Sequence, residues 1–342
     1  MKKSVESIVR ALENSGAMMK PYMSKDEMLD GYLKYQKAVL EQLFINQADK
    51  FKLYDAVNYL EIHAAEKGIG ENPVIVKAIT DLRNISREIA TTINGKCGEE
   101  SVRKALNYTN RNIITMPNIH LSDGFDRTEI DQIVITSNGI LILEVKHYKK
   151  NIVISPSGKI ENCDKTLGEQ MNVKRHLLRT KLEQALYNTY SDLPLHIESR
   201  VVFSNPDSNV TDNYKLEKLC YKAHLPHEIE NFTSNVKYSN RQMTLIETLI
   251  TEFAEEETYP VKYDFNRIRK TFAEALVLLE NEEKEDKVVE EAEEDKIVNF
   301  DLNQNNFVVK PRKKSKVDKF VAIAVHTVLA AASVYEYVKS LK

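Results

Sequence analysis

The stretch EIDQIVITSNGILILEVKHY, residues 129–148, decides the fold expected for this chain. Two runs rich in Ile, Val and Leu flank Asn138-Gly139, a dipeptide typical of the two-residue turn of a β-hairpin. Both faces of these runs carry apolar side chains, which is typical of strands that are covered on both sides. The sequence therefore predicts a buried hairpin at the centre of a sheet.

The turn fixes which charged residues of the hairpin share a face. If Asn138-Gly139 forms the turn, Ser137 faces Ile140 and Asp131 lies opposite Lys146. Strand side chains alternate between the two faces of a sheet, so Asp131, Glu144 and Lys146 are expected on one face. A displacement of the pairing by one residue would send the two acids to opposite faces.

Two interpretations of these three charges stay open from the residues alone. The first is a structural ion pair between Asp131 and Lys146, with Glu144 solvated at an edge. The second is a metal site, because two neighbouring carboxylates hold Mg²⁺ through oxygen ligands and a lysine beside them stabilises charge on a phosphate. A covered hairpin favours the second, since burying an unpaired carboxylate is costly.

Four elements of the region from Gly95 to about Phe203 resemble the NERD (nuclease-related) domain of the PD-(D/E)XK nuclease superfamily. They occur in the order expected for that family. They are Gly95-Lys96-Cys97-Gly98-Glu99, Ile130-Asp131-Gln132-Ile133-Val134-Ile135, Glu144-Val145-Lys146-His147-Tyr148, and Gln170 near the start of a helix.

This resemblance implies an α/β fold with a PD-(D/E)XK restriction-endonuclease-like core, a mixed central sheet flanked by helices, and helical N-terminal and C-terminal extensions. It also implies that Asp131 and Glu144 bind Mg²⁺ or Mn²⁺, that Lys146 assists catalysis, and that Glu99 and Gln170 complete the site. Read without the family, Glu99 is an acid near a helix N-terminus, where the helix dipole favours it.

Basic residues follow the expected site on a helix predicted over residues 168–188. Lys174, Arg175 and Arg179 are candidates for binding nucleic-acid phosphates, and their alternative role is a solvated helix face. Gln132 departs from the family pattern, which usually has His at this position. Because the net charge of the chain is only −3, any binding of nucleic acid is expected to come from local basic patches such as this one.

The 342-residue chain is expected to divide into five segments. Ser24 and Asn72-Pro73 supply helix-start signals in the first segment, and a further helix is expected from Gly98 to Thr109. The segments are a helical N-terminal region (1–94), a nuclease-like core (95–235), a helical extension (236–280), an acidic spacer and linker (281–311), and a basic stretch with an apolar C-terminal helix (312–342).

The apolar run over residues 320–338 has about the length of a membrane-spanning helix. Basic residues precede it, so a spanning helix would hold the main chain at the cytoplasmic face of the membrane. The alternative is a helix packed on the core or on a partner. The three cysteines form no CxxC pair and the N-terminus has no apolar signal core, which favours a cytoplasmic protein.

The sequence thus favours a metal-dependent nuclease that acts on nucleic acid, with DNA as the preferred substrate and endonuclease action favoured over exonuclease action. A role in bacterial defence against foreign DNA is expected by analogy alone. The second hypothesis is a catalytically inactive, nuclease-like scaffold that recruits partners through its helical regions. The N-terminal helices are also candidates for homo-oligomer contacts.

Overall fold

The computed structural model describes residues 4–16, 19–149, 151–160, 166–188, 192–215 and 217–298, with side chains to residue 281. One compact unit comprises Met1–Glu283, and a second comprises Lys284–Lys342. Within the second unit only the backbone at the end of the last helix is described.

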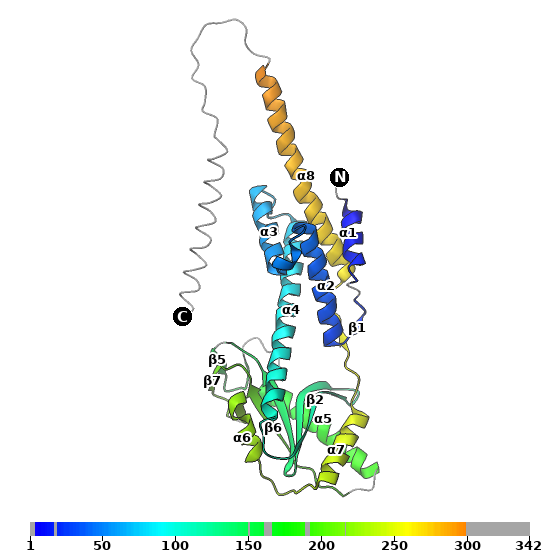
Figure 1. The fold of residues 1–342 in the computed structure, drawn as a ribbon, viewed down its shortest axis with the longest axis vertical. Coiled ribbons are helices and arrows are strands. Elements are labelled where there is room, and N and C mark those ends of the chain that lie inside the picture. Colours follow the sequence, from blue (N-terminus) through cyan, green and yellow to red (C-terminus); the bar gives the residue numbers. More distant parts are fainter. Residues whose placement is uncertain are drawn as a thin grey trace. The chain divides into compact units, whose positions relative to one another are not determined.

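Five strands form the central sheet in the order β2-β3-β4-β6-β8. The first three pair antiparallel, whereas β6 runs parallel to β4 and β8 runs parallel to β6. This arrangement, visible in Figure 1, confirms the mixed central sheet expected from the sequence. The strands span Ile113–Ser122 (β2), Arg127–Thr136 (β3), Gly139–Lys146 (β4), Ile197–Phe203 (β6) and Leu219–Tyr221 (β8), and a separate parallel pair spans Asn151–Ile154 (β5) and Asn209–Asp212 (β7).

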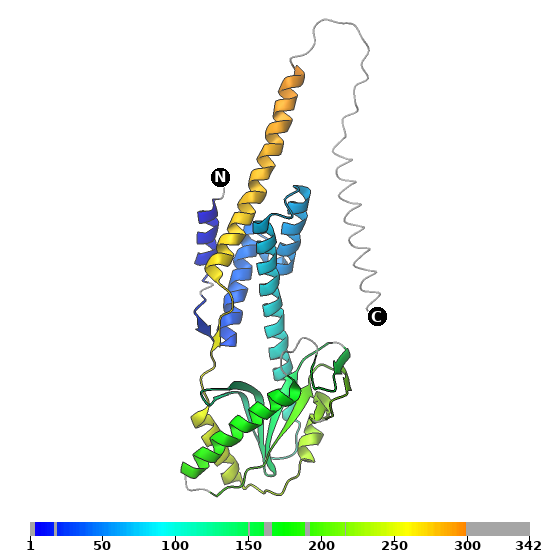
Figure 2. The same ribbon diagram turned by 180° about the vertical axis from the view of Figure 1, so that it is seen from behind.

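Helices cover both faces of the central sheet. One face packs on α5 (Leu167–Asn188) and α7 (Asn240–Phe253), and Figure 2 shows α5 lying across it. The other face packs on α6 (Leu225–Glu230) and the C-terminal part of α4 (Pro73–Leu106). The two apolar layers explain why β3 and β4 carry Ile, Val and Leu at consecutive positions instead of alternating with polar residues.

The predicted turn at Asn138-Gly139 is wrong by one position. The structure pairs Thr136 with Gly139, so Ser137 and Asn138 form the two-residue turn. A type I′ turn needs positive φ at both central residues, yet Asn138 keeps a negative φ and only Gly139, already in the strand, has a positive value of 134°.

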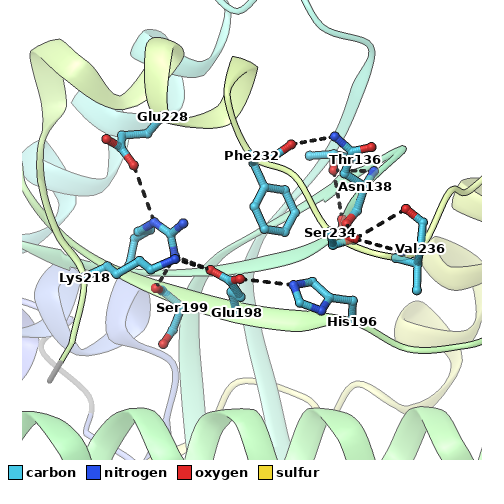
Figure 3. A network of polar contacts seen from close by, with 12 residues as sticks. Thr136, Asn138, His196, Glu198, Ser199, Lys218, Glu228, Phe232, Ser234 and Val236 are labelled. Carbon is cyan, nitrogen blue, oxygen red and sulfur yellow. Dashed lines mark hydrogen bonds and ion pairs between the residues drawn. The ribbon is translucent and has the colours of Figure 1, made fainter.

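Polar contacts of Asn138 explain this displacement. Its backbone N–H donates to Thr136 Oγ1 at 3.0 Å, and its side-chain Nδ2 donates to the carbonyl of Phe232 at 2.5 Å. Ser234 and Lys237 also donate to Asn138, and Figure 3 shows the network around it. Asn138 therefore anchors the hairpin to the segment that follows α6. These contacts replace the type I′ turn that was expected at Asn138-Gly139.

Despite this displacement, the charged residues of the hairpin lie on one common face, as predicted. Gln132 pairs with Leu143, so Asp131 comes opposite Glu144 instead of Lys146. Moving the turn by one residue shifts the cross-strand pairing by two, and two is the period of side-chain alternation. Asp131, Glu144 and Lys146 therefore share a face even though their predicted partners were wrong.

The separate helix expected from Gly98 is also wrong, because α4 is one continuous helix of 34 residues that passes through the expected boundary at residue 95. Gly98 is needed for packing and does not mark a helix start. A Cβ on Gly98 would lie 2.7 Å from His147 Cβ and 2.9 Å from Ser204 Oγ. The missing side chain lets α4 approach the ends of β4 and β6.

A second apolar core is built from helices alone. It combines α1 (Val5–Asn14), α2 (Lys25–Leu43), α3 (Leu53–Glu66), the first part of α4 and the first part of α8 (Phe265–Val298). The expected caps are confirmed, with Ser24 beginning α2 in a capping box and Asn72 capping α4 ahead of Pro73.

Residues 236–280, predicted as a helical extension, contain two helices, α7 and the first part of α8. The apolar face of α7 belongs to the sheet core, whereas Phe265 and Phe272 of α8 belong to the helical core. Between them, β9 (Tyr259–Pro260) pairs with β1 (Tyr22–Met23). The segment is divided because two separate apolar cores each bury one of its helices.

In the part of the chain that the structure describes, no helix is long and apolar enough to cross a membrane. The apolar run over residues 320–338 and the basic residues before it lie outside the described residues.

Two glycines of α4 provide a matched test of the packing. Gly98→Ala is expected to lower the free energy of unfolding by about 1–3 kcal/mol, because overpacking outweighs the gain in helix propensity. Gly95→Ala is expected to raise it by up to about 1 kcal/mol, because its new Cβ makes only an ordinary contact, 4.0 Å from Glu99 Oε1. Urea unfolding measures both, and a stabilised Gly98→Ala would contradict the close approach.

Candidate active site

Two carboxylates lie next to each other on the α5 face of the hairpin. Asp131 on β3 comes opposite Glu144 on β4, and the backbone N–H of Val145 donates to Asp131 Oδ2 at 2.6 Å. Their side chains are 15% and 7% exposed. Burial at this level costs free energy unless each charge finds a partner.

Two lysines provide those partners. Lys146, two residues after Glu144 on the same strand, places its Nζ 2.6 Å from Glu144 Oε1. Lys174 comes from α5, donates to Glu144 Oε2, and lies 3.7 Å from Asp131 Oδ1. The cluster therefore contains two negative and two positive charges in a largely buried setting.

Mutual electrostatics separate the pKa values of the two acids. Burial and the charge of Glu144 raise the pKa of Asp131 above its usual value. Burial acts to raise the pKa of Glu144 as well, but the charges of Lys174 and Lys146 have the larger combined effect, so the pKa of Glu144 is lowered overall. Burial acts to lower the pKa of Lys146, yet the charge of Glu144 raises it overall. Next to Glu144, the protonated form of Lys146 is therefore favoured, and it donates to that carboxylate.

The donor set can hold a divalent ion. The ammonium of Lys174 contacts both carboxylates, which shows that oxygens from Asp131 and Glu144 converge on one position that a cation occupies. No cluster of three or more His, Cys, Asp or Glu ligands occurs among the residues that the structure describes. Two carboxylates are nevertheless a donor set that divalent ions such as Mg²⁺ commonly use, with water or phosphate completing the coordination.

Glu99 lies at the edge of this cluster on α4. Burial, followed by the charge of Asp131, raises the pKa of Glu99 to about 7, while Lys25 and Lys96 oppose the shift. Its predicted neighbour in the site, Gln170, lies one helical turn before Lys174 on α5 and is partly buried. The structure thus places both residues on the two helices that flank the carboxylates.

The three basic residues predicted on α5 do not form one surface. Lys174 is buried with the carboxylates, and Arg175 makes a bidentate contact with Glu217 at 2.9 and 3.0 Å. Arg179 is 43% exposed and lies 3.6 Å from Glu183. Of the three, Arg179 has the most exposed side chain.

A contact from the N-terminal helices reaches the site and was not predicted. Lys25 of α2 places its Nζ 2.6 and 2.7 Å from the carboxylate of Glu129, which also accepts from Tyr259 Oη at 2.6 Å. Glu129 lies two residues before Asp131 on β3, on the same face. Lys25 and Glu129 are 104 positions apart, so no local pattern could have revealed the contact.

Residues 94–204 match the family model of NERD, the nuclease-related domain. The matched region contains Glu99, Asp131, Glu144, Lys146 and Gln170. Comparisons with curated proteins and with solved structures give no match. The domain match and the mixed sheet with flanking helices identify a PD-(D/E)XK-like core and indicate a nuclease-like function.

The raised pKa of Glu99 gives a testable pH dependence. Its neutral form is favoured in the folded state, so wild-type stability should fall as pH rises from about 4.5 to about 7, the range between the unfolded and folded pKa values of this carboxyl. Glu99→Gln lacks this titration, so its stability relative to wild type should increase over that range. Urea unfolding in EDTA from pH 4.5 to 8 measures the difference, and a difference independent of pH would contradict the shift.

Proposed function

We propose that this chain is a metal-dependent nuclease that hydrolyses phosphodiester bonds in DNA, with Mg²⁺ or Mn²⁺ held by Asp131 and Glu144. One observation carries the proposal. Within a region that matches the nuclease-related domain, the side chains of Asp131, Glu144 and Lys146 converge on the same face of a central hairpin.

The residues of the chain have separate roles in this proposal. A divalent ion, when bound, supplies Lewis-acid activation of the phosphate and of the attacking water. Lys146 keeps its proton, so it donates hydrogen bonds to phosphate oxygens as their charge develops. Lys146 and Lys174 keep Glu144 ionised, which is the state required to bind a cation.

Substrate phosphates are proposed to contact the basic residues of α5. Arg179 supports this role best because its side chain is the most exposed of the three, whereas Arg175 is engaged with Glu217. Lys174 is proposed to neutralise the two carboxylates first and to contact the phosphate second, because it already forms ion pairs with both acids.

Other predictions from the sequence extend this proposal. They are endonuclease action, a role in defence against foreign DNA, a cytoplasmic location with membrane attachment through the C-terminal segment, and homo-oligomer contacts through the N-terminal helices.

A second candidate function is an inactive nuclease-like scaffold that recruits partners. The balanced ion pairs favour it, because Lys146 and Lys174 neutralise both carboxylates without a metal. The two functions differ in whether an added cation binds and in whether any nucleic acid is cut.

Cleavage assays separate the two candidates. Purified chain with Mg²⁺ or Mn²⁺ is expected to cut DNA, and Asp131→Asn or Lys146→Ala should reduce the rate by about 10²-fold or more, because each removes transition-state stabilisation. The substrates are plasmid, linear double-stranded DNA, single-stranded DNA and RNA. Glu252→Gln, on the exposed side of α7, is the matched control and should cut at the wild-type rate. Failure to cut any substrate with either metal would contradict the nuclease function and favour the inactive scaffold.

Metal binding can be measured without activity. Mn²⁺ at about 100 times its dissociation constant should stabilise the wild type by about 2.7 kcal/mol, and so raise its melting temperature by several degrees. Asp131→Asn and Glu144→Gln should lose this rise, because each removes a ligand, whereas the control Glu252→Gln should keep it. An equal rise in melting temperature in all four proteins would mean that the ion binds away from Asp131 and Glu144.

A further inference from the structure

A cavity of about 540 Å³ lies between α2, α4 and the β9 segment. Its volume falls within the range of about 300–1,000 Å³ that is typical of small-molecule sites. Most of its wall lies outside the matched nuclease-related region, because α2 and β9 lie before and after residues 94–204. The cavity is therefore a feature of this chain that the domain match does not assign.

The cavity and the candidate active site share a wall. Glu99 lines the cavity and feels the charge of Asp131. Lys25 also lines the cavity, and its ammonium binds Glu129, two residues before Asp131 on β3. A ligand in the cavity would consequently lie next to the carboxylates.

The remaining wall combines apolar surface with positive charge. Met28, Tyr32, Tyr259 and Pro260 provide apolar and aromatic surface. Three lysines line the cavity, and each already contacts an acid: Lys25 contacts Glu129, Lys96 contacts Asp26 and Lys262 contacts Glu88. The last two pairs each include a side chain that is more than 70% exposed, so they are weak and their lysines can turn to an anionic ligand. The wall thus favours a ligand with a flat apolar part and an anionic part. The lining residues that carry charge are Lys25, Lys96, Lys262, Glu88 and Glu99.

The aromatic wall is held in place from two sides. Tyr259 Oη donates to Glu129 at 2.6 Å, and Lys25 Nζ lies 5.5 Å from the centre of the Tyr259 ring. The backbone N–H of Lys25 donates to Glu257 Oε1 at 2.8 Å. These contacts tie α2 and the β9 segment to β3, so the cavity is largely preformed for a ligand.

We propose that this cavity binds one nucleotide unit, with its base against the apolar and aromatic wall and its phosphate toward the lysines. A nucleotide combines the two properties that the wall selects, a flat π-face and a negative charge. The proposal rests on the proposed nuclease function and deepens it: helix α2 and the β9 segment, not only the nuclease-related region, recognise the substrate. The nucleotide is either a unit of the substrate strand beside the cleaved bond or a free mononucleotide.

Gly95 offers a substitution that fills the cavity with little risk to the fold. Apart from its chain neighbours and the backbone of its own helix, the nearest described atom to a Cβ built on Gly95 is Glu99 Oε1, at 4.0 Å. Because Gly95 lines the cavity, Gly95→Leu is expected to fill part of it, and a change of Gly95 to Leu or to Ala should raise helix propensity. Gly95→Ala adds one methyl group and is the matched control. Urea unfolding verifies that both variants fold.

The binding experiment uses a single-stranded oligodeoxynucleotide that contains 2-aminopurine, in EDTA to prevent cleavage. Wild type and Gly95→Ala are expected to bind it with a change in 2-aminopurine fluorescence. Gly95→Leu should bind about 5- to 150-fold more weakly, because loss of one stacked base costs about 1–3 kcal/mol. Equal binding by wild type and both variants, or a Gly95→Leu complex with the wild-type fluorescence change, would overturn the proposal.

A second arm distinguishes the two sources of the nucleotide. Added dAMP is expected to displace the oligonucleotide if a unit of the strand occupies the cavity. Binding of dAMP that is lost in Gly95→Leu but does not displace the oligonucleotide would assign the cavity to a free mononucleotide.

Cleavage by the same proteins separates this proposal from the proposed function. If wild type cuts DNA and Gly95→Leu cuts as fast as Gly95→Ala, with the same apparent affinity, the cavity proposal fails alone. If wild type cuts nothing, the nuclease function fails, and the cavity proposal then fails as a substrate site as well.

Discussion

Two carboxylates buried side by side on a covered hairpin are the constraint on which the rest of the structure depends. Asp131 and Glu144 cannot stay ionised there without partners, because the surrounding apolar core offers no solvation. Lys146 comes from the same strand, but Lys174 must be supplied by α5, so that helix is fixed across the sheet. The arrangement is costly for stability alone, which is why it indicates a function.

Helix α4 connects this constraint to the helical core. The helix belongs to both apolar cores, and Gly98 allows it to contact His147 and Ser204 at the ends of β4 and β6. The next residue, Glu99, is thereby placed beside Asp131 and on the wall of the cavity. One glycine thus couples the packing of the long helix to the electrostatics of the candidate site.

The same ion pairs bear on both candidate functions. Lys174 shows that the two carboxylates receive a cation, as a metal-dependent nuclease requires, but it also neutralises them as an inactive scaffold would. The position of Lys25 on Glu129 adds a reason to consider the N-terminal helices part of the functional unit. The chemistry of the site therefore depends on side chains from both cores.

The sequence by itself determined the central hairpin, the mixed sheet with flanking helices and the common face of Asp131, Glu144 and Lys146. The hairpin and the common face follow from local periodicity, which survives a turn displaced by one residue because side chains alternate with period two. The mixed sheet was implied by the resemblance of the sequence to the nuclease-related domain. Tertiary structure decided the turn at Asn138, whose partners lie after α6, and the continuity of α4 through Gly98. It also decided that Lys174 serves the carboxylates and that Lys25 reaches Glu129. These contacts join residues far apart in the chain, and local patterns carry no information on them.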